Sequence, residues 1–250
     1  MAGQKKIGNI KVKICQDKQE VAQEGAKIFA KDIKEKPDIV LGLATGGTPM
    51  GMYQELIRMY KEEGLDFSRA ISFNLDEYVG LSGDHSQSYR HFMDDNLFNH
   101  INIDKAKTHV PSGIAEDASA SCQEYEENIK TQGGVDLQLL GIGSNGHIAF
   151  NEPGSSSDSR TREVGLTEKT IKDNARFFEN ESEVSRRAVT MGIATILEAK
   201  KIVLLATGSN KAEAVAKATK NPATTDIPAS FLQNHPDCVF IVDQKAASGL

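Results

Sequence analysis

The stretch Val135-Asp-Leu-Gln-Leu-Leu140, followed at once by Gly141-Ile-Gly-Ser-Asn-Gly-His-Ile-Ala-Phe-Asn-Glu-Pro153, decides the fold of this chain. The first part is an apolar run of strand length, and the second is a glycine-rich turn that carries His147 and Glu152. In an open α/β sheet, ligands bind in the crevice outside the carboxyl ends of the strands. The pattern therefore predicts a buried strand that ends in a loop with acid–base chemistry.

The same glycines match a dinucleotide-binding fingerprint, because Gly141, Gly143 and Gly146 have the spacing G-x-G-x-x-G. That fingerprint requires a helix to begin at the last glycine, so that its N–H groups meet a pyrophosphate. Pro153 cannot lie inside such a helix, and it also disfavours the helical conformation of Glu152. The context therefore argues against NAD binding.

Similar apolar runs recur along the chain, and stretches of helical period separate them. The expected strands are 38–44, 70–75, 135–140, 201–206 and 238–242, and the expected helices lie near 18–35, 50–63, 87–99, 117–131 and 210–219. Strands that alternate with helices imply βαβ units, and continuous apolar strands imply a sheet covered on both faces. We therefore predict an α/β fold: one domain over 1–250 with a doubly wound, mostly parallel sheet, which a chain of this length can fill.

Composition excludes several functional classes. The 250-residue chain has a net charge of −6, so its overall field favours neither nucleic acid nor an acidic membrane. It shows no signal peptide and no apolar stretch of membrane-spanning length. Its three cysteines form no C-x-x-C pair, which is typical of reduced, buried cysteines in a cytoplasmic protein. The histidines show no metal-ligand spacing, so we expect no metal.

The segment within 154–187 interrupts the alternation of strands and helices. It begins with Gly154-Ser-Ser-Ser-Asp-Ser-Arg-Thr-Arg162, which is small and polar. Such composition is typical of a solvated surface loop. Because it follows the glycine-rich loop directly, a lid over a site is the functional alternative.

Thr45-Gly-Gly-Thr48 offers a device for holding an anion in an acidic chain. It follows the expected strand 38–44 and precedes a helical pattern, and its glycines let the backbone approach a ligand. Thr48 suits the N-cap and Pro49 the first helical position. We expect the free N–H groups of that helix to face the crevice, where they can bind phosphate. A simple strand-to-helix turn is the plainer alternative.

A second strand–glycine–helix junction lies at Thr207-Gly-Ser-Asn-Lys211. Lys211 falls in the first turn of a helix, where a cation opposes the helix dipole unless an anion offsets it. Arg176 is a third candidate, since a guanidinium can grip phosphate with two hydrogen bonds. These junctions together predict a small molecule with one phosphate.

Acid–base candidates follow the expected strands. Asp76 and Glu77 are adjacent, so one can face the crevice while the other turns away. A carboxylate in a partly apolar place suits proton abstraction beside a carbonyl, although a turn or cap aspartate is the plainer reading. Glu152 is close enough in sequence to orient His147 and tune its basicity. The chain has no G-x-S-x-G motif for a serine hydrolase.

Taken in order, these motifs resemble one family closely, the glucosamine-6-phosphate deaminases, also called isomerases. The resemblance runs from about Ile39 to Asp243 and includes Leu41–Pro49, Phe73–Leu81, His85-Ser-Gln-Ser-Tyr89, Gly141–Pro153, Ser159–Arg162, Asn174-Ala-Arg-Phe-Phe178 and Gly208–Ala212. It implies conversion of glucosamine 6-phosphate and water to fructose 6-phosphate and ammonium, in amino sugar (N-acetylglucosamine) catabolism. It also implies a modified Rossmann-type sandwich and no cofactor.

The resemblance assigns roles to matching positions. His147, held by Glu152 and Asn145, would open the sugar ring, and Asp76 would move a proton from C2 to C1. The substrate-binding positions it implies are Thr45, Gly46, Gly47, Thr48, Gly141, Arg176 and Lys211.

Two positions depart from part of that family. Asn145 stands where one branch has aspartate, so it can orient His147 but adds no charge. Val164 stands where the hexameric branch activated by N-acetylglucosamine 6-phosphate has lysine, and the chain ends soon after Asp243. We therefore expect no allosteric activation, and a monomer or a homo-oligomer rather than a hexamer.

Two rival functions stay open at this point. A 6-phosphogluconolactonase shares the Gly-Gly-Thr loop and the glycine-histidine segment, but its hydrolysis needs no base at C2. The stretch Asn74-Leu-Asp-Glu-Tyr78 and the stretch Phe150-Asn-Glu-Pro153 favour the deaminase. A sensor that binds a phosphosugar without turnover is the rival from another class. The chain has no room for a helix-turn-helix module and it is acidic, and both features count against a sensor that regulates through nucleic acid.

Overall fold

The computed structural model describes residues 3–168, 170–171 and 185–250. Its strands are β1 (Gly3–Ile7), β2 (Ile10–Cys15), β3 (Val40–Leu43), β4 (Ile71–Asn74), β5 (Asp76–Tyr78), β6 (Thr108–His109), β7 (Leu137–Leu140), β8 (Arg162–Gly165), β9 (Arg187–Thr190), β10 (Lys201–Ala206) and β11 (Cys238–Asp243). Its α-helices are α1 (Lys18–Glu35), α2 (Met50–Glu63), α3 (Tyr89–Asn96), α4 (Ala118–Thr131), α6 (Ile193–Leu197) and α7 (Ala212–Lys220). Short 3-10 helices are η1 (Phe98–His100), η2 (Lys105–Lys107), η4 (Ser209–Lys211) and η5 (Pro228–Asn234).

Within these ranges the main sheet has eight strands in the order β1-β2-β11-β10-β7-β3-β4-β6. All neighbours from β2 to β6 pair in parallel, and only β1 pairs antiparallel, at the edge. The predicted α/β class with a mostly parallel sheet is confirmed. The hairpin of β1 and β2 and the short β6 were not predicted.

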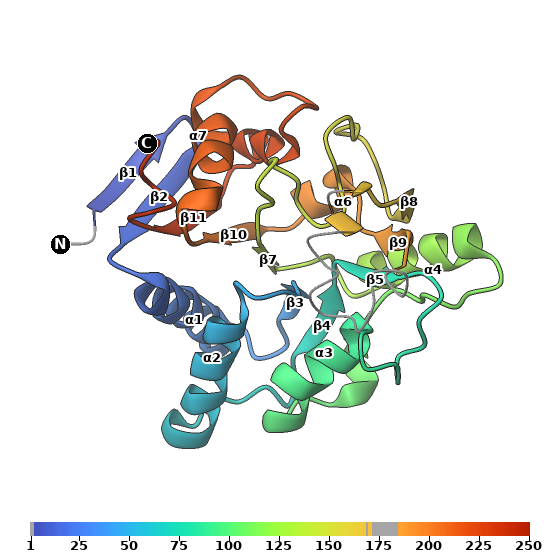
Figure 1. The fold of residues 1–250 in the computed structure, drawn as a ribbon. Coiled ribbons are helices and arrows are strands. Elements are labelled where there is room, and N and C mark those ends of the chain that lie inside the picture. The colour runs from blue at the N-terminus through green and yellow to red at the C-terminus, as the bar shows by residue number, and fades with distance from the viewer. Residues whose placement is uncertain (1–2, 169, 172–184) are drawn as a thin grey trace.

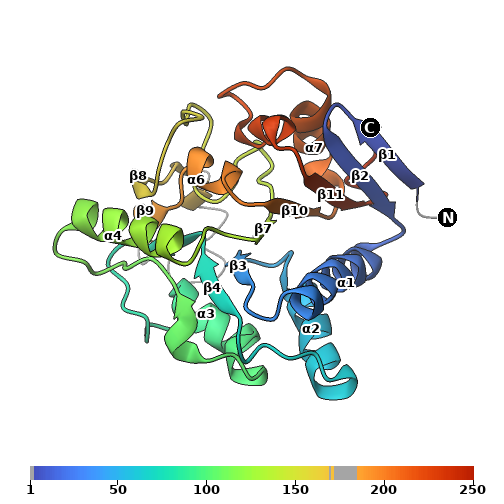
Figure 2. The same ribbon diagram turned by 180° about the vertical axis from the view of Figure 1, so that it is seen from behind.

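Helices cover both faces of this sheet, as its continuous apolar strands require. All residues of β3 and β7 are buried. Helix α1 packs against β10, β11 and α2. In Figure 1, α1, α2 and α3 lie below the sheet and α7 lies above it, while Figure 2 shows α4 beside β8. None of the described helices is long and apolar enough to cross a membrane.

The chain reverses its direction of travel through the sheet between β3 and β7. From β3 it proceeds to β4 and β6 on one side, and then to β7, β10 and β11 on the other. Such a reversal opens a crevice at the carboxyl ends of the two strands where it occurs, and ligands bind there. The loops that follow β3 and β7 therefore border the predicted site.

A second sheet of three strands, β5-β9-β8, joins this edge. Strand β5 pairs antiparallel with β9, and β9 pairs antiparallel with β8. Part of the segment 154–187 is therefore strand rather than loop, whereas 154–161, before β8, is turn and coil as predicted. The strands escaped prediction because they are short and charged, and because their partners are distant in sequence.

Candidate active site

The loop after β3 faces open space at its glycines. Gly46 has a φ of +94°, a backbone conformation that glycine adopts without strain. A Cβ built at Gly46, Gly47 or Gly141 would meet no atom of the described residues within 4 Å. The loops after β3 and β7 thus leave room where a ligand must approach backbone.

The start of α2 differs from its prediction. The N-cap is Pro49, in helical conformation and with no side-chain cap bond, and not Thr48. Pro49 fits here because its O accepts the helical bond from the N of Tyr53 at 2.9 Å, and its missing N–H is not needed. Buried Tyr53 also donates its hydroxyl to the O of Ala44 at 2.6 Å, which fixes the end of β3. The α2 N-terminus still follows the glycine loop, as an anion site requires.

The loop after β10 is held by a carboxylate from the next strand. Gly208 has a φ of +91°, and its N donates to both oxygens of Asp243, at 3.1 and 3.0 Å. Asp243 also accepts from the N of Ala246 at 2.7 Å. Lys211 is the last residue of η4 and the N-cap of α7, so it lies just before the first turn of that helix and not within that turn, where the sequence predicted it.

Asp76 is the first residue of β5, directly beyond the end of β4. It pairs with Thr190 of β9, and only 6% of it is exposed. Burial, helped by the charge of neighbouring Glu77, raises the pKa of Asp76 to about 8. A carboxyl with a pKa near the working pH can both take and return a proton.

Glu77 turns away from Asp76 and caps α3. Its carboxylate accepts from the backbone N of Tyr78 at 2.8 Å, of Tyr89 at 2.9 Å and of Arg90 at 3.0 Å. Tyr89 and Arg90 are the first residues of α3, where free N–H groups need such a partner. Burial raises the pKa of Glu77, while these bonds act to lower it. The two adjacent carboxyls therefore differ in role: Glu77 caps α3, whereas the carboxyl of Asp76 is not used in this way.

The glycine-rich loop after β7 forms a turn rather than a helix. Asn145 shapes it, because its Oδ1 accepts from the N of His147 at 3.3 Å. The imidazole of His147 packs on the backbone of Gly143, where a Cβ would lie 2.3 Å from the ring. Gly143 therefore serves to seat His147. The helix that a dinucleotide fingerprint requires does not follow Gly146.

Glu152 bridges this loop and the segment after β8. Its Oε2 accepts from Nδ2 of Asn145 at 2.7 Å and lies 3.6 Å from Nδ1 of His147. Its Oε1 accepts from the hydroxyl of Thr170. Although burial raises it, the pKa of Glu152 falls to about 2, because His147, Thr170 and Asn145 favour the charged form. Glu152 is an anion beside the imidazole at any physiological pH.

The small sheet links Asp76 to the His147 loop. Thr190, which pairs with Asp76, accepts with its Oγ1 from the N of Phe150 at 3.1 Å. The rings of Phe150 and Tyr78 lie 5.8 Å apart. Asp76 and the loop that carries His147 therefore share one support, at the same edge of the main sheet.

Tyr89 is a site residue whose role the sequence did not indicate, although its motif was noted. Its hydroxyl donates to the hydroxyl of Tyr78 at 3.3 Å, and the side chain of Thr45 acts to lower its pKa. Burial is the largest cause that raises the pKa of Tyr89, and Tyr78 and the carboxyl of Asp76 add to it. Tyr89 thus connects the predicted phosphate loop with the predicted base.

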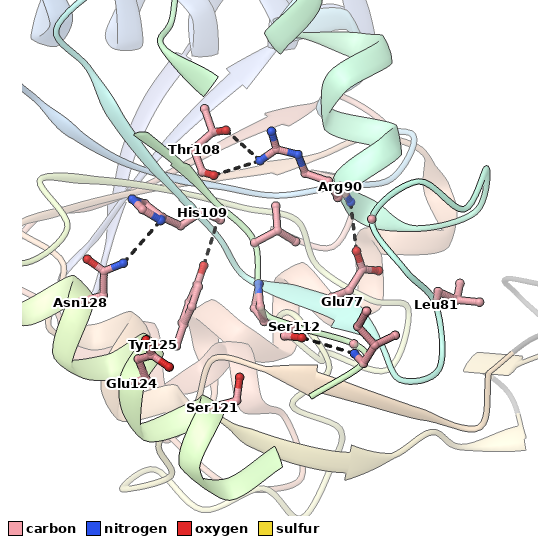
Figure 3. A pocket seen from close by; sticks show the side chains of 15 residues that line it. Glu77, Leu81, Arg90, Thr108, His109, Ser112, Ser121, Glu124, Tyr125 and Asn128 are labelled. Carbon is pink, nitrogen blue, oxygen red and sulfur yellow. Dashed lines mark hydrogen bonds between the residues drawn. The ribbon is translucent and has the colours of Figure 1, made fainter. Parts of the chain in front are cut away.

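A cavity of about 430 Å³ lies on the other side of Glu77. Its walls come from β6, α3, α4 and the loop after β6, and Figure 3 shows Arg90 donating to Thr108 and Asn128 meeting His109. Tyr125 in this wall donates to the backbone O of Asn74 at 2.8 Å. Glu77 lines this cavity and none of the other described candidate residues does, so we assign the cavity to the support of β4 and β5.

The structure therefore brings most of the predicted residues to one edge of the sheet. These are Thr45, Gly46, Gly47, Thr48, Asp76, Gly141, Asn145, His147, Glu152 and Lys211. Arg176 lies outside the described residues. Two further contacts, by Thr170 and Asp243, carried no sequence signal beyond their places near a loop and at a strand end.

Sequence comparison finds close relatives over nearly the whole chain. The profile of the family described as glucosamine-6-phosphate isomerases/6-phosphogluconolactonase matches residues 16–240. The glucosamine-6-phosphate deaminase of Thermoanaerobacter pseudethanolicus is 56% identical over 239 residues, which is 96% of this chain and 94% of that protein. The deaminase of Clostridium perfringens is 56% identical over 234 residues, or 94% of this chain and 97% of that protein.

Solved structures agree with these relatives. A monomeric glucosamine-6-phosphate deaminase superposes with a TM-score of 0.94 at 48% identity, covering 96% of this chain and 99% of that one. The 6-phosphogluconolactonase of Trypanosoma brucei gives 0.75 at 22% identity, covering 96% of this chain and 98% of that one, and so shares the fold alone. From its profile, its relatives and its fold, this chain belongs to the glucosamine-6-phosphate isomerase/6-phosphogluconolactonase family.

Proposed function

We propose that this protein is a glucosamine-6-phosphate deaminase, an enzyme that converts glucosamine 6-phosphate and water to fructose 6-phosphate and ammonium. The observation that carries the proposal is 56% identity, over nearly the full length, to proteins of that name. The similarity to a lactonase, at 22% identity, extends only to the fold. A buried carboxyl with a pKa of about 8 also suits the proton transfer that deamination needs.

Substrate capture begins at the phosphate. The loop 45–48, the cation of Lys211 and Arg176 hold it in this proposal, and Gly141 borders the sugar. The loop glycines with open space at their Cβ positions and the two helix N-termini support this role. Binding energy from a remote phosphate orients the sugar for a reaction that needs only positioned acids and bases.

Ring opening falls to His147 and its partners. The imidazole takes the proton of the C1 hydroxyl and delivers it to the ring oxygen, so that the ring C–O bond breaks and an open aldehyde forms. The permanently charged carboxylate of Glu152 stabilises the imidazolium that this transfer creates, and Asn145 holds that carboxylate.

Asp76 carries out the isomerisation. After the 2-amino aldehyde forms, the carboxylate of Asp76 removes the proton from C2 to give an enolamine and then returns the proton to C1. Water then hydrolyses the resulting ketimine, which releases ammonium and leaves the ketone at C2. The small sheet that ties Asp76 to the loop of His147 supports action on neighbouring carbons of one sugar.

The wider setting belongs to the same proposal. We place the enzyme in the cytoplasm, in N-acetylglucosamine catabolism, as one domain with a lid within 154–187, a range of which 169 and 172–184 lie outside the described residues. Val164 and the likeness to a monomeric deaminase support an enzyme without allosteric activation, and a monomer rather than a hexamer. Activation by N-acetylglucosamine 6-phosphate, or a hexamer in solution, would contradict this.

A coupled ammonium assay with the purified chain tests the activity. We expect ammonium from glucosamine 6-phosphate and no cleavage of 6-phosphogluconolactone. Lactone cleavage without ammonium release would make the protein a lactonase. Binding of glucosamine 6-phosphate without any turnover would make it a sensor.

A further inference from the structure

We propose that Thr170 is a positioning residue for ring opening, which acts by holding Glu152 against His147. The inference rests on the proposed function of the His147–Glu152 pair. It adds a residue from outside the glycine-rich loop to that pair.

The contact is built from a buried hydroxyl. Thr170 is only 6% exposed, and its hydroxyl donates to Oε1 of Glu152. The hydroxyl of Thr167 lies 3.1 Å from Oγ1 of Thr170 and 3.4 Å from Oε1 of Glu152, so it can donate its one proton to either oxygen. Oγ1 of Thr170 is the nearer of these two acceptors, and when it accepts from Thr167 it gives its own proton to the carboxylate of Glu152.

The two oxygens of Glu152 are therefore held from opposite elements. Asn145 of the glycine-rich loop holds Oε2 at 2.7 Å, and Thr170 from beyond β8 holds Oε1. Oε2 lies 3.6 Å from Nδ1 of His147, and that buried nitrogen meets no hydrogen-bond partner among the described residues. A small rotation of the carboxylate decides whether it reaches the imidazole. Thr170 and Asn145 together define that rotation.

A purely structural role would have a different consequence. Thr170 also donates its backbone N to Oγ1 of Thr167 at 3.2 Å, which stabilises the local turn regardless of the Thr170 hydroxyl. Replacing the hydroxyl by a methyl group keeps the shape and this backbone bond. Any loss of activity in Thr170→Val then reports on Glu152.

The test compares Thr170→Val, Thr170→Ser and a matched control, Thr219→Val. Thr219 is a buried threonine of α7 whose hydroxyl donates to the O of Val215 at 2.9 Å, so its loss affects stability without contacting the site. We expect kcat to fall about tenfold or more in Thr170→Val, as for a lost hydrogen bond to a charged group. Thr170→Ser should recover most of it, and Thr219→Val should retain wild-type kcat.

Binding of an acyclic amino-alditol 6-phosphate separates ring opening from substrate capture. This ligand has no ring to open, so its Kd should be the same for wild type and Thr170→Val. If the wild type releases ammonium and Thr170→Val has the same kcat as Thr219→Val, the inference is wrong and the proposed function stands. A wild-type enzyme that releases no ammonium would instead overturn the proposed function.

A double-mutant cycle keeps the inference testable if Thr170→Val is poorly folded. Thr170→Ala and Glu152→Gln are combined, and kcat is measured only on samples with a cooperative unfolding transition. If Thr170 acts through Glu152, the losses are far from additive. Additive losses would contradict the inference.

Discussion

At the scale of single residues, two adjacent carboxyls behave differently because of their surroundings. Three backbone N–H groups bind Glu77, whereas burial dominates at Asp76 and raises its pKa to about 8. An acid whose pKa is raised by folding destabilises the folded state once it ionises. The surroundings of Asp76 thus lower stability once its carboxyl ionises, and they suit the proton transfer proposed for it.

Replacing Asp76 by Asn should remove activity and stabilise the protein at high pH. The neutral carboxyl of Asp76 makes its full contribution to the free energy of unfolding below the unfolded pKa of 3.8. That contribution is lost as the pH rises through about 8. A pKa that folding raises by one changes the free energy of unfolding by about 1.4 kcal/mol across that range of pH. Thermal unfolding at pH 9 should give a higher Tm for Asp76→Asn than for wild type, with little difference at pH 4. C2 proton exchange at the wild-type rate would remove Asp76 from the mechanism.

Replacing Glu77 by Gln should shift the pH dependence of activity. The charge of Glu77 raises the pKa of Asp76, so its loss lowers that pKa, and the acidic limb of kcat/KM moves from about pH 8 to lower pH. An amide oxygen still accepts backbone bonds at the start of α3, so the protein should fold. An unmoved acidic limb would show that another group controls it.

At the scale of elements, the site depends on strand ends that hold neighbouring loops. Asp243, at the end of β11, fixes the N of Gly208 and so sets the start of α7. Tyr53 of α2 fixes Ala44 at the end of β3 in the same way. Each proposed phosphate loop is thus positioned by a side chain from a different element, and this would pre-organise the loop before a substrate arrives.

Replacing Asp243 by Ala should weaken substrate capture more than turnover. Without its carboxylate, Gly208 and Lys211 lose their fixed place, and we expect KM for glucosamine 6-phosphate to rise about tenfold, as for about 1.4 kcal/mol. Asp243→Asn keeps one acceptor oxygen, so its KM should lie between those of the wild type and Asp243→Ala. Initial rates at varied substrate give both constants. A fall in kcat at constant KM would contradict a role in phosphate binding.

At the scale of the whole molecule, the reversal of strand order between β3 and β7 places the site. Gly42 of β3 pairs with Gln138 of β7, and the side chain of Gln138 occupies the space where a side chain at position 42 would lie. A Cβ on Gly42 would lie 2.1 Å from Oε1 of Gln138. The packing of the two strands at which the chain reverses therefore requires a glycine at position 42.

Replacing Gly42 by Ala should destabilise the fold by ~1–3 kcal/mol, as overpacking of a core does. Adding Gln138→Ala should relieve the clash and recover part of that loss, whereas independent sites would simply add. Urea unfolding of the wild type, both single variants and the double variant measures the coupling. Additive penalties would show that the two side chains do not meet.

By itself the sequence determined the α/β class, the five central strands, and the residues at their carboxyl ends. Buried parallel strands appear in the sequence as continuous apolar runs. The glycines, helix-capping residues and charged residues that follow a strand can likewise be recognised from neighbouring residues alone. Asp76, His147, Glu152 and Lys211 were predicted as site residues in this way.

Only the tertiary structure decided what depends on partners distant in sequence. The short strands β5, β8 and β9 exist by pairing with one another, so no local pattern announces them. Packing likewise gives Asp76 and Glu77 their different environments. It also creates the hydrogen bonds from Gly208 to Asp243 and from Thr170 to Glu152. Burial and hydrogen bonds set the pKa values on which the chemistry depends, and both exist only once the chain is folded.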